Sequence, residues 1–245
     1  MDLNTHMPHR TMTIKELAQL LGIDLHRMER MAQRGEIPCH KVGNQFRFNR
    51  AEITDWLQRN MATMSSGHLA EVDAGITADR QTEKNEAILI PLLRVEAVTA
   101  SLGARTKNST LRDLVALAQK TGLVHDGEAL LEGLIQREEL GSTAMEGGIA
   151  IPHPRHPLPY AIAEPILAVA RTTQGILFCG PDGLPTRLFF LIASQDDRHH
   201  VHILARLCRM LQDQDLISQL GEAETAEQMV ELMKQGELKV LSESV

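Results

Sequence analysis

The sequence predicts two domains, a small mainly-α domain followed by an α/β sandwich with a mixed sheet. The chain has 245 residues, of which 43% are hydrophobic, a size that suits one large or two modest domains. Helix-capping residues follow one another closely near the start of the chain, whereas strand-like runs alternate with helices from about residue 86. Net charge divides similarly, being +2 over residues 1–60, −2 over 61–85 and −7 over 86–245. We expect domains at residues 12–60 and 86–240, joined by a linker at 61–85.

The first domain begins with two short helices separated by a turn. Thr13 and Glu16 form a T-x-x-E capping box, and leucines at helical spacing follow. Gly22 ends this helix. Asp24 is a favourable N-cap for a second helix, which Gly35 is placed to close.

A hairpin and a third helix complete the domain. Residues 40–42 and 45–48 alternate around a Gly-Asn pair, which predicts two strands joined by a tight turn. Asn49 and Glu52 then repeat the capping pattern before another helix. Helix, turn, helix, hairpin and helix within 60 residues is the plan of a winged helix-turn-helix domain.

Three runs in this domain are specific: MTIKELAQLLGI, then a second helix ending in RGEIP, then KVGNQFRFNRAEITDWL. Residues 12–57, which contain them, closely resemble the excisionase and MerR-type DNA-binding domain family. In that family the second helix enters the major groove and the wing contacts the DNA backbone. The resemblance implies base contacts by His26, Arg27 and Arg30, and phosphate contacts by Arg34, Lys41 and Arg47.

Two outward residues of the second helix depart from the family, which often has polar or basic residues there. They are Leu25 and Glu29, and Glu29 would repel phosphate unless it accepts a bond from a cytosine amino group. Only a few phosphate contacts are expected per module, so useful affinity for double-stranded DNA should require a homodimer on paired half-sites. The alternative is an ordinary solvated helix face on a domain that does not bind DNA.

Residues 61–85 mix Ser, Gly, Ala, Thr and acidic residues without a sustained apolar period. This composition predicts a linker, part of which could be helical. The second domain follows, with caps at Asp126 and a helix-closing Gly122. Its expected strands cover residues 97–102, 148–151, 165–172 and 186–194, its expected helices cover 109–121 and 126–139, and three further helices close the chain.

The first candidate site is a histidine cluster after an apolar run. In residues 148–156, GIAIPHPRH, a buried strand stops at a proline and His153 follows in a stiff turn. We therefore expect His153 to be exposed and fixed.

The second candidate is RHHVH, at the start of the helix that follows residues 186–194. At about 100° per residue, His200 lies on the apolar stripe of this helix, whereas His199 and His202 point away. Only His200 should face the domain, from a first turn that favours anions and keeps imidazole neutral. His156, His199 and His202 are expected at the surface.

A fixed neutral histidine, a second histidine at a helix N-terminus and a nearby arginine would suit a phosphoryl group carried on imidazole nitrogen. A metal site is the rival, because H-x-x-H and H-H-x-H supply enough ligands. The helical angles separate His199 and His202 from His200, so neither a metal nor another cofactor is predicted.

Three motifs occur in order along the second domain: REELGSTAMEGGIAIPHPRHP, then FCGPDGLPTRLFFLIA, then HVHILARLCRML. Residues 87–238 strongly resemble the fructose, mannitol and nitrogen-regulatory type of enzyme IIA of the bacterial phosphotransferase system. The resemblance implies that His153 is the phosphoacceptor, His200 the second histidine of the pocket and Arg137 the basic residue near the phosphoryl group. Pro154 replaces the small residue that is common after the acceptor. Ser142 and Thr143 could donate hydroxyls or be turn residues.

The resulting hypothesis is a phosphotransferase-linked transcriptional regulator, whose His153 accepts a phosphoryl group from a phosphohistidine carrier protein. The alternative is a nitrogen-type phosphocarrier or protein-binding switch whose first domain serves dimerisation or localisation. Either would be a phosphocarrier rather than a turnover enzyme, and sugar transport by this chain alone is not expected.

No stretch approaches the roughly 18 uncharged apolar residues of a membrane span, and MDLNTHMPHR lacks the apolar core of a secretory signal. A cytoplasmic location with no membrane partner is therefore expected. Three widely spaced cysteines suit neither a disulfide framework nor a C-x-x-C zinc site.

Overall fold

The computed structural model describes residues 11–79 and 86–243. The chain falls into two compact units, one within residues 1–84 and the other within residues 85–245. The two-domain fold class is therefore confirmed, and each unit is described by itself.

Helices α1 (Ile14–Leu20) and α2 (Leu25–Arg34) form the helix-turn-helix of the first unit. The Thr13 hydroxyl accepts a hydrogen bond from the backbone N–H of Glu16, whose carboxylate accepts from Thr13 N–H, so the expected capping box is present. Asp24 caps α2 through the N–H groups of His26 and Arg27. Gly35 ends α2 at φ +70°, in the left-handed region that glycine tolerates.

The wing is a hairpin of β2 (His40–Val42) and β3 (Gln45–Asn49), followed by α3 (Arg50–Asn60). A third strand, β1 (Thr11–Thr13), pairs antiparallel with β3 and gives the order β1-β3-β2. Strand β1 is not predicted from the sequence, because three residues show no alternating pattern.

Residues 61–79, within the segment predicted as a linker, are mostly helical. They form the short 3-10 helix η1 (Met61–Thr63) and the helix α4 (Ser66–Asp79). Helix α4 contacts α1, and its buried side chains Leu69, Val72 and Ile76 have helical spacing. Interspersed small and polar residues conceal this spacing in the sequence.

The second unit contains a five-stranded mixed sheet of order β4-β7-β8-β6-β5. Strand β4 is parallel to β7, β7 antiparallel to β8, β8 parallel to β6, and β6 antiparallel to β5. The strands are β4 (Leu93–Leu102), β5 (Ala144–Met145), β6 (Ile149–Ala150), β7 (Ile166–Ile176) and β8 (Thr186–Ala193).

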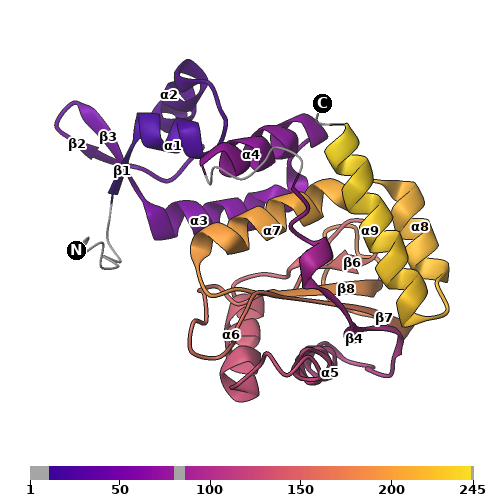
Figure 1. Ribbon diagram of the computed structural model, residues 1–245. Helices are drawn as coiled ribbons and strands as arrows, with labels where there is room; N and C mark the ends of the chain where they lie inside the picture. The colour runs from indigo at the N-terminus through magenta and orange to yellow at the C-terminus, as the bar shows by residue number, and fades with distance from the viewer. Residues whose placement is uncertain (1–10, 80–85, 244–245) are drawn as a thin grey trace, which may run out of the picture. The chain divides into compact units, whose positions relative to one another are not determined.

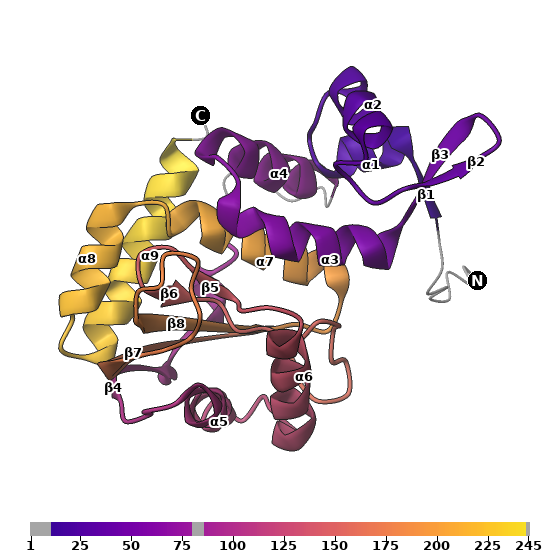
Figure 2. The same ribbon diagram turned by 180° about the vertical axis from the view of Figure 1, so that it is seen from behind.

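Helices cover both faces of this sheet, as Figures 1 and 2 show. Helices α5 (Lys107–Gln119) and α6 (Gly127–Glu139) lie on one face. Helices α7 (Asp197–Met210), α8 (Gln214–Glu222) and α9 (Ala226–Ser242) lie on the other. The predicted α/β sandwich with a mixed sheet is thus confirmed.

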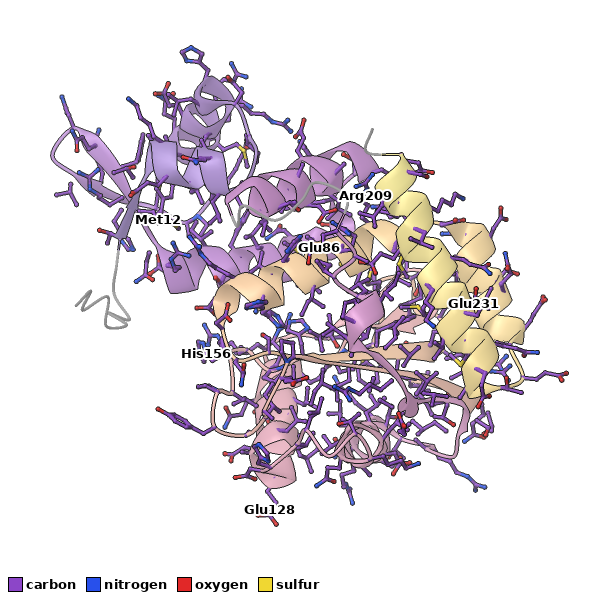
Figure 3. The ribbon with its side chains drawn as sticks, viewed as in Figure 1. Met12, Glu86, Glu128, His156, Arg209 and Glu231 are labelled. Carbon is purple, nitrogen blue, oxygen red and sulfur yellow. The ribbon has the colours of Figure 1, made fainter. Side chains whose placement is uncertain are left out.

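Hydrogen bonds connect the start of this unit to its last helix, α9. Glu237 of α9 is fully buried and accepts hydrogen bonds from the N–H groups of Ile88, Leu89 and Ile90, just before and within the 3-10 helix η2 (Ile90–Leu92). Arg206 of α7 pairs with the Glu237 carboxylate at 3.3 Å and donates to the Glu86 carbonyl; Figure 3 labels Glu86. No helix in residues 11–79 and 86–243 is long and apolar enough to cross a bilayer.

Candidate functional site

His153 lies just beyond β6, in a segment that continues along β8. The Pro152 carbonyl accepts a hydrogen bond from Ile192 N–H at 3.0 Å. This continued pairing keeps residues 151–154 buried, and only 2% of His153 is exposed. The prediction of an exposed His153 is therefore wrong, because the chain does not leave the sheet at Pro152.

The His153 ring is oriented by its own backbone. Its Nδ1 lies 2.7 Å from the carbonyl oxygen of Ile151, an acceptor, so Nδ1 carries the proton and Nε2 carries the lone pair. Burial, then the nearby His200 and Arg137, hold the His153 pKa well below its ordinary value, against the opposing Ile151 bond. The ring is therefore neutral at pH 7.

His200 faces His153 from the first turn of α7. The two ring centroids lie 5.1 Å apart, with the ring planes tilted by 47°. Burial and the nearby Arg137 lower the His200 pKa to about 4, although Asp196, the helix N-cap, opposes this. The prediction that His200 points inward is confirmed.

The two rings leave one pair of nitrogen atoms unsatisfied. Nε2 of His153 and Nε2 of His200 are buried, and neither has a hydrogen-bond partner among the described residues. Arg137 of α6 is also buried, and one of its guanidinium N–H groups donates to the Gly141 carbonyl at 2.9 Å. The structure thus brings His153, His200 and Arg137 together, with a lone pair on His153 and positive charge nearby.

The other histidines of the two clusters differ from one another. His156, labelled in Figure 3, is exposed as predicted, and His199 is half-buried and pairs with Asp196. His202 is buried, so its predicted surface position is wrong. Helix α7 is covered on more than one side, because Arg206, one turn further along, is buried against Glu237. The described part of the chain holds no group of three or more metal-ligating side chains.

Ser142 and Thr143 have other partners for their hydroxyl groups. The Ser142 hydroxyl donates to the Phe178 carbonyl, and the Thr143 hydroxyl donates to the Glu138 carboxylate. Glu138 is not among the residues predicted from the sequence, although its position next to Arg137 and five residues before Thr143 is a usable signal. Gly133 of α6 is likewise missed: a Cβ there would lie 3.2 Å from the Pro154 ring, so glycine gives Pro154 room against the helix.

The exposed face of α2 gathers the predicted DNA contacts. His26, Arg27, Arg30 and Arg34 lie within about 100° of one another around the helix, opposite the buried Met28 and Ala32. Three of the four have acidic neighbours, which form the pairs His26–Glu29 at 3.6 Å, Arg27–Glu71 at 3.5 Å and Arg34–Glu36 at 3.6 Å.

The wing separates its two predicted phosphate contacts. The strand register places Arg47 opposite His40 and Lys41 opposite Phe46, so Lys41 and Arg47 lie on opposite faces of the hairpin. Lys41 is exposed, and the Arg47 guanidinium donates to Gln45 at 2.6 Å and to the Phe46 carbonyl.

Comparison with known families agrees with this architecture. Residues 91–236 match the family described as phosphoenolpyruvate-dependent sugar phosphotransferase system, EIIA 2. Residues 11–61 match the family described as helix-turn-helix domain. The chain therefore belongs to the EIIA family and carries a helix-turn-helix domain before the EIIA domain.

Similar proteins carry two kinds of name, fructose-specific PTS component and nitrogen regulatory protein. The chain is 36% identical over 140 residues to a nitrogen regulatory protein of Bradyrhizobium diazoefficiens, covering 56% of this chain and 88% of that protein. It is 31% identical over 141 residues to the fructose-specific EIIA component of Haloferax volcanii, covering 57% and 90%. A match to the fructose-specific EIIABC component of Bacillus subtilis, 28% identical over 146 residues, spans 59% of this chain and only 22% of that relative's length.

Solved structures share the fold of the second unit. The nitrogen regulatory protein IIA-Ntr from Neisseria meningitidis superposes with a TM-score of 0.54 at 22% identity, covering 60% of this chain and 99% of that one. The mannitol IIA from Escherichia coli superposes with a TM-score of 0.51 at 22% identity, covering 58% and 98%.

Proposed function

We propose that the protein is a phosphotransferase-linked transcriptional regulator. His153 accepts a phosphoryl group from a phosphohistidine carrier protein, and the first domain binds double-stranded DNA. The observation that carries the proposal is a pair of buried Nε2 atoms on facing rings beside the Arg137 guanidinium, neither with a hydrogen-bond partner in the described part of the chain.

The transfer uses the lone pair on His153. Nε2 attacks phosphorus as the phosphorus–nitrogen bond of the donor's phosphohistidine breaks, and the donor imidazole takes back its electron pair. The proton of His153 stays on Nδ1 throughout, and Nδ1 donates it in a hydrogen bond to the Ile151 carbonyl oxygen. Arg137 and a hydrogen bond from His200 stabilise the phosphoryl oxygens, because phosphoryl transfer depends mainly on positioning and charge stabilisation. Since His153 is only 2% exposed, the donor must displace covering side chains to reach it.

The direct test supplies phosphoenolpyruvate, the general phosphotransferase enzyme and its phosphocarrier protein to the purified full-length chain. We expect one acid-labile phosphate, located on His153 by mass spectrometry under neutral conditions and lost in His153→Ala. His156→Ala, which replaces an exposed histidine three residues away, should be labelled like the wild type. Labelling that persists in His153→Ala would overturn the assignment of the acceptor.

DNA binding is the second half of the proposal. The cluster of His26, Arg27, Arg30 and Arg34 opposite the core of α2 supports entry of this helix into the major groove. Lys41 and Arg47 contact phosphates on either side of the wing. A homodimer places two modules on paired DNA half-sites, since one module offers few phosphate contacts. DNA selected from a random pool, titrated at stated ionic strength with the stoichiometry measured, tests this half.

The similarity to nitrogen regulatory proteins favours one alternative. In it the EIIA domain acts as a phosphocarrier or protein-binding switch, and the first domain serves dimerisation or localisation. Selection that enriches no DNA sequence, together with phosphorylation of His153, would favour this alternative over a transcriptional regulator.

A further inference from the structure

Glu138 joins three elements close to the candidate phosphoacceptor. It is the residue after Arg137 on α6, and only 7% of it is exposed. Its Oε1 accepts hydrogen bonds from the N–H of Thr143, at 3.0 Å, and from the Thr143 hydroxyl. Its Oε2 lies 2.7 Å from Nζ of Lys107, the first residue of α5. The carboxylate therefore ties the loop after α6 to another helix.

A short chain of hydrogen bonds continues from Thr143 to the acceptor ring. The Thr143 carbonyl accepts from Ile151 N–H at 3.1 Å. The Ile151 carbonyl in turn accepts from Nδ1 of His153 at 2.7 Å. Strands β5 and β6, which lie between Thr143 and Ile151, pair with each other, so the two ends of this stretch move together.

We propose that Glu138 is a positioning residue for the phosphoacceptor. By fixing Thr143, and through it the Ile151 carbonyl, Glu138 keeps the proton of His153 on Nδ1 and aims the lone pair of Nε2 at the incoming phosphorus. This inference rests on the proposed phosphoryl transfer to His153, but its effect on the ring exists before any phosphate is present.

A carboxylate suits this position because three groups that the structure places against its two oxygens can all donate. The Thr143 N–H, the Thr143 hydroxyl and the Lys107 ammonium can all donate, and a carboxylate offers only acceptors. A glutamine would bring an amide NH2 group against one of them. If its NH2 faces Lys107, two donors meet; if the amide flips, the bonds to Thr143 are lost.

This reasoning supplies a rescue variant. Replacing Lys107 by methionine removes the donor that conflicts with the glutamine amide. The Lys107 amine lies 4.9 Å from the centre of the Phe178 ring, a place that a methionine side chain can also fill. The double variant Lys107→Met/Glu138→Gln should therefore restore the Thr143 bonds. Glu139→Gln is the matched control, because Glu139 is the adjacent, exposed carboxylate on the same helix.

The experiment compares these variants in the full chain by two measurements. Ring-nitrogen chemical shifts of unphosphorylated protein report the His153 tautomer. Single-turnover transfer from the phosphorylated carrier protein, over a range of carrier concentrations, separates the maximal rate from carrier binding. In Glu138→Gln we expect mixed tautomers and a maximal rate about 10- to 100-fold lower, since small misplacements of a reacting group cost this much. Carrier binding should be unchanged, and the double variant should regain tautomer and rate.

A folded Glu138→Gln protein with wild-type tautomer and rate would overturn the inference. If that variant does not fold, Glu138→Asp makes the same test, because it keeps the charge but withdraws the carboxylate from Thr143. Should the wild type accept no phosphoryl group, the proposed function fails by itself. The ring-nitrogen shifts then decide the inference alone, and shifts unchanged by the Glu138 substitution would overturn it.

Discussion

Gly75 of α4 packs directly against Gly22, the residue that ends the turn after α1. A Cβ built on Gly75 would lie 2.4 Å from the backbone nitrogen of Gly22, and one built on Gly22 would lie 2.3 Å from the Glu71 carbonyl oxygen. Both neighbours are backbone atoms, which cannot move aside as a side chain can. Helix α4 is therefore an integral part of the first unit.

Gly75→Ala should lower the stability of that unit by about 1–3 kcal/mol, the usual cost of overpacking. Gly67→Ala is the matched control on the same helix, because a Cβ at Gly67 meets nothing within 4 Å. Its stability should be unchanged or slightly higher, since alanine favours helix. Trp56 is the only tryptophan of the chain and lies in α3, so urea unfolding followed by tryptophan fluorescence reports on this unit. Equal stability of the two variants would contradict the close packing.

His200→Phe should slow phosphoryl transfer by about 10- to 1,000-fold, the range for losing one electrostatic donor. Phenylalanine keeps the ring volume and removes an Nε2 atom that has no hydrogen-bond partner among the described residues. The melting temperature should therefore stay within a few degrees. Single-turnover transfer and thermal unfolding check the two halves. Unfolding of the variant would mean that His200 serves the fold instead.

The low pKa values of His153 and His200 make the second unit sensitive to acid. The native rings stay neutral, whereas the same side chains in the unfolded chain gain protons below about pH 6.5. Because the unfolded state then binds more protons, the stability of the native state decreases as the pH is lowered. With the His200 pKa near 4, this residue alone should cost on the order of 3 kcal/mol between pH 6.5 and 4.

Urea unfolding at pH 7.5 and 4.5, followed by far-ultraviolet circular dichroism, should show this loss, and His200→Phe should show less of it. Ring signals of His200 should remain unshifted from pH 8 to near pH 5. Titration of His200 near pH 6.5 would contradict the buried, neutral state.

Arg30 and Arg34 should differ in their effect on DNA binding. Arg30→Ala should weaken binding to a selected site by about 1–3 kcal/mol and relax base preference, because Arg30 is proposed to read a base. Arg34→Ala should weaken selected and random DNA alike and reduce the salt dependence, as expected of a phosphate contact. Anisotropy titrations with both DNAs at several salt concentrations distinguish these outcomes. Identical behaviour of the two variants would contradict the assigned roles.

Phosphorylation of His153 should weaken DNA binding by roughly 5- to 150-fold, the usual range of coupling between sites. The phosphoryl group adds about −2 charge to residues 86–245, which already carry −7. Reciprocally, DNA should disfavour the phosphorylated state to the same extent. Fluorescence anisotropy with one DNA site, at one ionic strength, compares modified and unmodified protein. Superimposable curves would mean that the two domains are merely tethered.

Local signals made most of the fold predictable. The caps at Thr13, Asp24 and Asp126 each begin a helix where the sequence places one. Strand β1 and helix α4 have weaker signals: β1 is defined by pairing with residues 47–49, which lie more than 30 residues along the chain. Helix α4 is stabilised by close backbone packing, which leaves no apolar pattern beyond three residues.

At the candidate site, the orientation of His200 was predictable from the sequence, but the burial of His153 and His202 was not. Helical spacing correctly aims His200 inward, because angle depends only on local geometry. The burial of His153 depends on the hydrogen bond between Pro152 and Ile192, which lie 40 residues apart in the sequence. His202 is buried although it points away from the apolar stripe of α7. The residues next to His153 and His202 in the sequence predict neither result.

The hydrogen bonds from three backbone N–H groups to Glu237 determine when, during synthesis, the second unit can finish folding. Residues 88–90 leave the ribosome long before residue 237 is made, yet their N–H groups are satisfied by that carboxylate. Strand β4, which follows them, is one of the two edge strands of its sheet and contacts α9. The second unit can therefore reach its native state only after translation has passed Glu237, and a nascent chain stalled earlier leaves these amides without their carboxylate.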